Sequence, residues 1–522
     1  MRLGIDFGTT RTVVAAVDRG NYPVVAFEAA DGCHYDWVPT LAAVRGEERV
    51  FGWEAWTKQT EPDWTPVRSI KRLLDDAGPN TVLDLDAVHV PLAELLGGMA
   101  AALRTLILEH SSLNLKAGEK LEAMLGVPAN ANSNQRFLTV EAFHAAGFEV
   151  LGLLNEPSAA SLEFGHKHQI DGRVLVYDLG GGTFDASLVD MSERRHYVVT
   201  SEGITTLGGD DFDEILAAMA LEAAGVKGGI EKFSQAEIFR LHDECRVKKE
   251  GLNPNSRRVT VDLDPVREGL GAVTIPVADY YERCRPLMEE TVHVVEDLLA
   301  AHGEDGMEAL YVTGGGSELP MVARVLRETF GRRVKRSAYT RSATAIGLAI
   351  QADEESGYAL REKFTRYFGV WREADAGRRV IFDPLFAKGV MLPLAGGSPV
   401  EIRRSYNPVH NIGHFRYLEC SHLGPDGEPR GDLTVWDEIL FPFEPSLRTR
   451  EDLPMRNVEQ SPGVVRERIE ERYAADAGGG VTVSIRNLTS GYGREYRLGR
   501  WAVRTEPVKP AGRRRAARRA GE

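Results

Sequence analysis

Two segments of this sequence place an aspartate, glycines and threonines at the end of an apolar run. "LGIDFGTT" occupies residues 3–10, and "LVYDLGGGTFD" occupies residues 175–185. In each segment an apolar run typical of a buried strand carries an aspartate to its end. The glycines allow the backbone to bend so that its N–H groups can face an anion without a Cβ in the way. Either segment alone is more often a plain hairpin, but the pair indicates a phosphate site.

The glycine-rich turns in these segments are the predicted phosphate-binding loops. They consist of Gly8, Thr9 and Thr10 in the first segment and of Gly180, Gly181, Gly182 and Thr183 in the second. The carboxylates of Asp6 and Asp178 would repel a phosphate unless a cation lay between, so we expect them to hold a hydrated Mg²⁺. Two such loops facing each other across a cleft would grip a triphosphate from both sides. The repetition therefore predicts a duplicated, two-lobed phosphate clamp.

A third glycine-rich turn occurs in "LYVTGGGSELP", residues 310–320, between an expected strand and an expected helix. Bare backbone and helix N–H groups at Gly315, Gly316 and Ser317 are suited to pack against a nucleoside. The alternative is a tight strand-to-helix turn that binds nothing, because short glycine motifs are not specific. Together with the two loops, this turn predicts a nucleotide site.

The elements that must position these motifs alternate between short apolar strands and helical stretches from residue 1 to about 352. Strands are expected at 121–129, 173–180 and 308–316, and helices at 98–110 and 321–330. Such alternation is typical of an α/β architecture with covered sheets. We therefore expect residues 1–352 to form an α/β nucleotide-binding domain.

The pattern of apolar and polar residues changes after residue 352. Residues 353–366 are expected to form a linker. Residues 367–505 contain half-buried strand patterns separated by Gly, Pro and Asp turns, and they predict a β-rich domain. Residues 506–522 carry many arginines and almost no apolar side chains, so we expect a disordered basic tail there.

Composition excludes several classes of function. The formal net charge of -14 over 522 residues argues against a surface that tracks nucleic-acid phosphates. The four cysteines lie far apart without a CxxC spacing, which predicts neither a disulfide framework nor a zinc site. No leader-like segment and no apolar stretch of about 20 residues is evident. We expect a cytoplasmic protein with no membrane partner and no specific nucleic-acid partner.

The ordered series of motifs resembles the seventy-kilodalton heat-shock chaperones of the DnaK type. The resemblance covers nearly all of residues 1–352 and, more faintly, residues 367–505. It implies a two-lobed actin-like (ribonuclease H-like) ATPase domain that binds ATP or ADP with Mg²⁺, followed by a β-sandwich domain. Phosphoryl transfer to water needs positioning and charge neutralisation more than covalent catalysis. One lysine, a metal ion and ordered hydroxyl groups are therefore sufficient for it.

Further motifs that match the family imply roles for individual residues. "SIKRLL" resembles the segment with the family's catalytic lysine, here Lys71, and "NEPSAA" resembles the segment whose glutamate lies near the metal and the attacking water, here Glu156. "GVPANANSNQR" is similar to the segment of an interdomain relay, which implies that role for Pro128 and Arg136. The catalytic positions implied by the resemblance are Lys71, Glu156, Asp178 and Thr183, and Asp185 also matches the family motif. The alternatives are that Lys71 is a solvated lysine and Glu156 an acid at a helix N-terminus, and the family order of the motifs favours the functional roles.

Departures from the family pattern concentrate where the adenine should lie. "GGSELP" is one residue shorter than the family's motif and lacks its arginine, and Arg341 stands where an acidic residue is usual. Arg246 stands in the place of a glutamate, and Arg11 follows the first loop where an uncharged residue is usual. The nucleotide-binding positions implied outside the glycine-rich turns are Arg11, Gly209, Arg246, Lys249 and Asn253. The phosphate end thus agrees with the family, whereas the base end differs from it.

The sequence predicts an ATP-dependent, chaperone-like protein with slow ATPase activity. Its β domain would bind unfolded or extended polypeptides without a helical lid, and a co-chaperone and a nucleotide-exchange factor are possible further partners. Residues 353–366 lack the family's leucine-rich docking run, so we expect weak coupling between the domains. An alternative is a nucleotide-dependent regulatory or interaction protein with slow or no ATPase activity and one dedicated partner. A small-molecule kinase fits less well, because it leaves the β domain unexplained.

Overall fold

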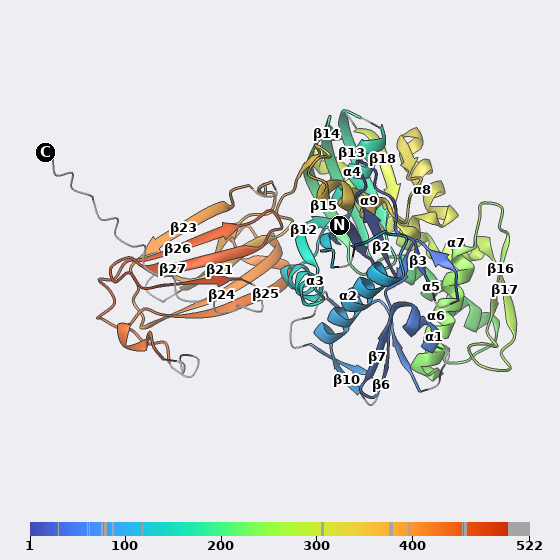
Figure 1. Cartoon of the computed structure of the whole chain (residues 1–522), viewed down its shortest axis with the longest axis horizontal. Coiled ribbons are helices and arrows are strands. Elements are labelled where there is room, and N and C mark those ends of the chain that lie inside the picture. The colour runs from blue at the N-terminus through green and yellow to red at the C-terminus, as the bar shows by residue number, and fades with distance from the viewer. Residues whose placement is uncertain are drawn as a thin grey trace. The chain divides into compact units, whose positions relative to one another are not determined.

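The computed structural model describes residues 1–498 except 30, 60, 62, 75–76, 78–80, 86–87, 117, 169, 304–306, 375–378, 395–396, 451–452 and 454–456. The chain forms two compact units, one of Met1–Thr365 with Gly389–Ala395 and one of Arg366–Lys388 with Gly396–Glu522 (Figure 1). The basic tail expected at 506–522 lies outside the described residues. Among the described residues, no helix is long and apolar enough to cross a membrane.

The first unit contains α-helices and strands in alternation, as the sequence predicts. Its helices are α1 (Gly52–Lys58), α2 (Leu92–Glu109), α3 (Ser133–Ala145), α4 (Glu156–His168), α5 (Gly209–Ala223), α6 (Gln235–Glu250), α7 (Val277–His302), α8 (Pro320–Phe330) and α9 (Ala343–Ala352). The strands of its two largest sheets are β1 (Arg2–Phe7), β2 (Arg11–Ala16), β5 (Val38–Pro39), β11 (Glu122–Val127), β12 (Glu149–Asn155), β13 (Gly172–Leu179), β14 (Phe184–Ser192), β15 (Arg195–Ile204), β18 (Met307–Thr313), β19 (Val334–Arg336) and β20 (Ala359–Arg361). The strands of its smaller sheets are β3 (Phe27–Glu28), β4 (His34–Tyr35), β6 (Ala42–Arg45), β7 (Glu48–Phe51), β8 (Thr65–Val67), β9 (Val82–Leu85), β10 (Val88–Pro91), β16 (Arg258–Asp262) and β17 (Ala272–Pro276).

The two large sheets of this unit share the topology of five strands, and β20 is an additional strand of the larger sheet. The five-stranded sheet has the order β12-β11-β1-β2-β5, and the six-stranded sheet has the order β19-β18-β13-β14-β15-β20. In each, an antiparallel hairpin (β1–β2 or β13–β14) has two parallel strands beside its first strand. The repeated sequence segments are the turns of these two hairpins. The duplication predicted from the motifs therefore extends to the strands around them.

Burial on both faces explains the continuous apolar run of β13. Leu175, Tyr177 and Leu179 belong to a core that includes residues of α5 and α7, and Val174 and Val176 belong to a separate core that includes residues of α4. A strand covered on both faces needs apolar side chains at successive positions, which is the pattern that the sequence shows. The aspartate at the end of this strand is thereby fixed to a rigid element.

Residues 353–365 of the segment expected as a linker belong to the first unit, and Arg366 belongs to the second. Strand β20 pairs in parallel with β15 at the edge of the six-stranded sheet, and Leu360 is buried. The buried carboxylate of Glu362 accepts a hydrogen bond from the Asn155 backbone N–H at 3.0 Å. The segment therefore pairs with a sheet edge although it lacks the leucine-rich run, and the expected weak coupling between the domains stays a prediction.

The second unit is β-rich, as predicted. Its strands are β21 (Tyr367–Ala374), β22 (Arg379–Phe386), β23 (Val400–Tyr406), β24 (Ile412–Leu423), β25 (Pro429–Pro442), β26 (Ile469–Ala475), β27 (Val481–Asn487) and β28 (Gly493–Arg497). They form two four-stranded antiparallel sheets with the orders β22-β21-β24-β25 and β23-β26-β27-β28. Arg372 on β21 forms an ion pair of 2.6 Å with the fully buried Glu471 on β26, which joins the two sheets.

Candidate nucleotide-binding site

The two predicted phosphate loops lie against each other. A Cβ built on Gly181 would lie 2.6 Å from Thr10 Oγ1, and one built on Gly182 would lie 2.5 Å from Thr9 Oγ1. The second loop closes on itself through a hydrogen bond of 2.9 Å from the Gly180 N–H to the Thr183 carbonyl. Glycine is therefore needed for the approach of the loops, in addition to any role toward an anion.

A buried lysine and buried carboxylates lie beside the loops. Lys71 Nζ forms an ion pair with Glu156, the first residue of α4, and both side chains are about nine-tenths buried. Burial alone lowers the pKa of Lys71, but the carboxylates of Glu156 and Asp6 outweigh it and leave that pKa raised. The site therefore contains a permanently charged cation beside the phosphate loops.

Neighbouring contacts fix the segment that carries Lys71. Ser69 Oγ donates to Asp210 at 2.6 Å, and Arg72 pairs with Asp211 at 2.6 Å. Arg72 Nε also donates to the Gly182 carbonyl at 2.9 Å. Because Asp210 and Asp211 lie in the first turn of α5, these bonds join the lysine segment to a helix that starts beside the second loop.

Three buried aspartates lie near Lys71, and one ammonium group cannot compensate the charge of all three carboxylates together with Glu156. Burial, reinforced by the charge of Glu156, raises the pKa of Asp6 to about 7 and the pKa of Asp178 well above its usual range. The same causes raise the pKa of Asp185 to about 7. Buried carboxylates of this kind fit a divalent cation, because an added positive charge would offset their mutual repulsion. No cluster of three or more His, Cys, Asp or Glu side chains placed to hold a metal directly occurs among the described residues, so the expected contact through water stays a prediction.

Lys249 and Gly209 lie where α5 and α6 approach the second loop. Lys249 Nζ donates to the Gly209 carbonyl at 2.6 Å and pairs with Asp213 at 2.8 Å. The Gly209 N–H donates in turn to the Gly180 carbonyl at 2.9 Å. Burial raises the pKa of Asp213 to about 6, although Lys249 opposes this shift. Lys249 thus links the two helices to the phosphate end of the cleft.

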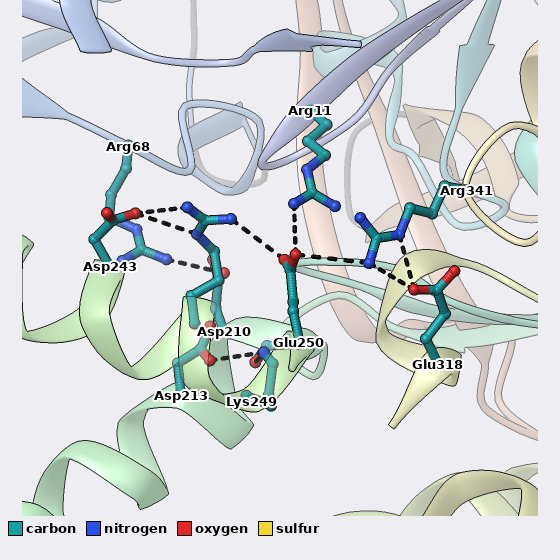
Figure 2. A network of polar contacts seen from close by, with 11 residues as sticks. Arg11, Arg68, Asp210, Asp213, Asp243, Lys249, Glu250, Glu318 and Arg341 are labelled. Carbon is teal, nitrogen blue, oxygen red and sulfur yellow. Dashed lines mark hydrogen bonds and ion pairs between the residues drawn. The ribbon is translucent and has the colours of Figure 1, made fainter. Parts of the chain in front are cut away.

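Elsewhere in the lining of the same cleft, three guanidinium groups surround one carboxylate (Figure 2). Glu250 lies 2.6 Å from Arg11, 3.3 Å from Arg246 and 3.6 Å from Arg341. Burial alone raises the pKa of Glu250, but Arg11 and Arg246 outweigh it and lower that pKa below its usual range. Glu250 is therefore ionised at neutral pH, and this part of the cleft is a network of compensated charges.

The structure brings most of the predicted site residues to one cavity. Those that line it are Asp6, Gly8, Thr9, Thr10, Arg11, Lys71, Glu156, Asp178, Gly180, Gly181, Thr183, Gly209, Arg246, Lys249, Gly315 and Gly316. Gly182 belongs to the second loop but packs on Thr9. The buried Ser317 donates its hydroxyl to the Gly314 carbonyl at 2.6 Å, and the exposed Asn253 accepts from the Asn255 N–H at 3.0 Å. These last two residues are outside the cavity lining.

The two predicted relay residues are outside the cavity lining but lie next to residues that contact the site. Pro128 precedes Ala129, whose N–H donates to Asp185 at 2.9 Å. Arg136 donates to the Asn155 side chain at 2.6 Å, and Asn155 precedes Glu156 in the chain. Pro128 is thus one residue before a backbone donor to Asp185, and Arg136 is hydrogen-bonded to the residue that precedes Glu156.

Sequence reasoning missed several residues of the cavity and its surroundings. They are Trp37, Asp213, Glu250 and Glu318. Glu250 carried one readable signal, because it follows Lys249 directly and lies one helical turn after Arg246. Trp37 carried none, since it lies between the short strands β4 and β5 and belongs to none of the motifs.

The comparisons with known proteins agree with this site. The family model described as Hsp70 protein matches residues 101–364, just over half of the chain. This chain belongs to the Hsp70 family. Hsp70 proteins are ATPases that bind ATP or ADP with Mg²⁺. A chaperone protein HscA homolog of Pseudomonas aeruginosa strain PAO1 is 30% identical over 376 residues, which cover 68% of this chain and 58% of that protein. Another, from Methylibium petroleiphilum, is 30% identical over 378 residues, which cover 68% and 59%. The matched part of this chain thus spans less than two thirds of the length of these relatives.

Proposed function

We propose that this Hsp70-family protein is an ATP-dependent chaperone that hydrolyses Mg-ATP in the cleft and binds extended polypeptide through its β unit. The proposal rests chiefly on one observation: two glycine–threonine loops of equivalent hairpins pack together beside a buried lysine and buried carboxylates. We infer that the two large sheets with their helices are the two lobes of an actin-like ATPase fold. The shared strand order supports this inference.

The residues of the cleft would have separate roles in phosphoryl transfer. The backbone N–H groups of both loops would bind the phosphates, and Asp6 and Asp178 would hold a hydrated metal ion. Bound Mg²⁺ would supply neutralisation of the phosphate charge. Lys71, oriented by Glu156, would neutralise the γ-phosphate and orient the attacking water, while the Thr183 hydroxyl would keep that water in line.

The β unit offers an edge where an extended polypeptide would bind. Strand β25 is the last strand of its sheet, and Leu433 and Val435 on it are more than half exposed. An edge strand provides main-chain hydrogen bonds, and exposed apolar side chains provide contacts for alternate residues of a peptide. A co-chaperone and a nucleotide-exchange factor are further proposed partners, in keeping with the family.

The test is ATP turnover by the full chain with and without a panel of unfolded peptides. A low basal rate that several unrelated peptides increase would support the proposal. Tight ATP binding with no turnover under any condition would contradict it, and would favour a nucleotide-dependent regulatory protein with one dedicated partner.

A further inference from the structure

The three arginines around Glu250 differ in their contacts with aromatic rings. The Arg11 guanidinium lies 4.5 Å from the centroid of the Trp37 ring, and that of Arg246 lies 5.2 Å from the Trp56 ring. Among the described residues, no aromatic ring is paired with the guanidinium of Arg341. Two of the three guanidinium groups thus already lie over indole rings, whereas the side chain of Arg341 has no such partner among the described residues and is about one-third exposed.

The edge of the Arg341 guanidinium is held by carboxylates. Its Nε and Nη2 atoms donate to one oxygen of Glu318 at 2.9 and 2.6 Å, and Nη2 lies 3.6 Å from Glu250 (Figure 2). Thr340 donates to the other oxygen of Glu318 at 2.6 Å and so fixes that carboxylate as well. The plane of the guanidinium is therefore set before a ligand arrives, which reduces the entropy lost on binding.

Arg341 lies beside the third glycine-rich turn, within the same cavity as the phosphate loops. A Cβ built on Gly315 would lie 3.9 Å from the Arg341 side chain. Gly315, Gly316 and Arg341 all line the cavity, and the side chain of Arg341 is about one-third exposed. A nucleoside extending from phosphates bound at the loops would therefore meet bare backbone and the open face of one guanidinium.

We propose that Arg341 is the residue on which the purine base of the bound nucleotide stacks, with Glu318 as its positioning residue. This inference rests on the nucleotide-binding function proposed above. A guanidinium whose edge is occupied by carboxylates has few donors left for the base, but its face still attracts a π-system. Stacking of this kind accepts every base, so we expect ADP and GDP to bind within about tenfold of each other.

The test compares two ligands that share their phosphates but not their base. The affinities of ADP and of inorganic tripolyphosphate for the full chain are measured by titration calorimetry with Mg²⁺. Arg341→Ala is expected to weaken ADP about tenfold and to change tripolyphosphate affinity less than about threefold. Arg341→Lys keeps the charge but loses the flat face, so it should weaken ADP nearly as much. Glu318→Gln, which keeps the cation but loosens its plane, should give an intermediate loss.

Arg336→Ala is the matched control, because Arg336 also lies near Glu318, at 3.9 Å, but is outside the cavity lining. It should change neither affinity. Unchanged ADP affinity in Arg341→Ala would overturn the inference, and so would equal losses for ADP and tripolyphosphate, which would make Arg341 a simple counter-charge. A wild-type protein that binds neither ligand would contradict the proposed nucleotide site itself. If Arg341→Ala does not fold, Arg341→Lys and Glu318→Gln decide between these outcomes.

Discussion

Replacing Lys71 by methionine tests the charge balance at the phosphate end of the cleft. The substitution keeps the length of the apolar stem and removes only the ammonium group. Lys71 and Glu156 are about nine-tenths buried, so the loss leaves a buried carboxylate without its partner. Breaking such a pair costs about 3–5 kcal/mol of the free energy of unfolding. We expect the first unit to unfold at a lower denaturant concentration but to remain folded at 25 °C.

The effect of Lys71→Met on chemistry should exceed its effect on binding. One preorganised charged group that acts on the transition state contributes about 100- to 1000-fold to turnover. Because the ammonium group is proposed to act on the γ-phosphate, which ADP lacks, ADP affinity should stay within about tenfold of wild type. The assay is single-turnover ATP hydrolysis, with ADP titration by calorimetry on the same preparation.

Lys58→Met is the matched control, because Lys58 forms a more exposed ion pair with Glu61 at 2.9 Å, outside the cavity lining. It should cost less than about 1 kcal/mol and leave turnover unchanged. ATP hydrolysis by Lys71→Met within threefold of wild type would refute the catalytic role. An equal loss of turnover and of ADP affinity would assign Lys71 a structural role instead.

Three other predictions concern the fold and the coupling of its parts. Burial lowers the pKa of His196 to about 4, so between about pH 6.5 and 4 this histidine is protonated mainly in the unfolded chain. The free energy of unfolding should therefore fall by about 3 kcal/mol as the pH is lowered through this range. Urea titrations of wild type and of His196→Gln, which should lack this loss, measure the difference. Gly208→Ala should weaken ADP more than about tenfold in calorimetry, because its Cβ would lie 2.6 Å from the second loop's backbone; Gly97→Ala, with open space, should not. Peptide dissociation rates in ATP and in ADP should differ less than about fivefold, since the docked segment buries little apolar area around Leu360.

The phosphate end could be predicted because its signals are local. Each loop lies within one hairpin, and a strand buried on both faces shows its nature in a short apolar run. The aspartates occur at fixed places in these same segments. Lys71 and Glu156 were predictable only through resemblance to a family, since nothing in their local sequence separates them from a solvated lysine or an acid at a helix N-terminus.

The base end could not be predicted in the same way. Arg11, Glu250 and Arg341 come from distant parts of the chain, and only the tertiary structure brings their charges together. Strand β20 escaped notice because it docks by backbone pairing, for which an apolar run is not required. Asn253 was predicted in the site through the family resemblance alone, whereas α6 ends at Glu250 and the Asn253 side chain accepts from the Asn255 N–H outside the cavity lining.

The most direct test of the proposed clamp is ATP affinity measured by calorimetry with Mg²⁺ and with a chelator, for wild type and Asp178→Asn. Asp190→Asn is the control, because Asp190 is about half exposed and pairs with Arg173 away from the cavity. If Asp6 and Asp178 act through a metal ion, chelation should weaken ATP binding sharply, Asp178→Asn should reproduce that loss, and Asp190→Asn should bind like wild type. Tight ATP binding that survives both chelation and Asp178→Asn would contradict the two-loop, metal-assisted clamp.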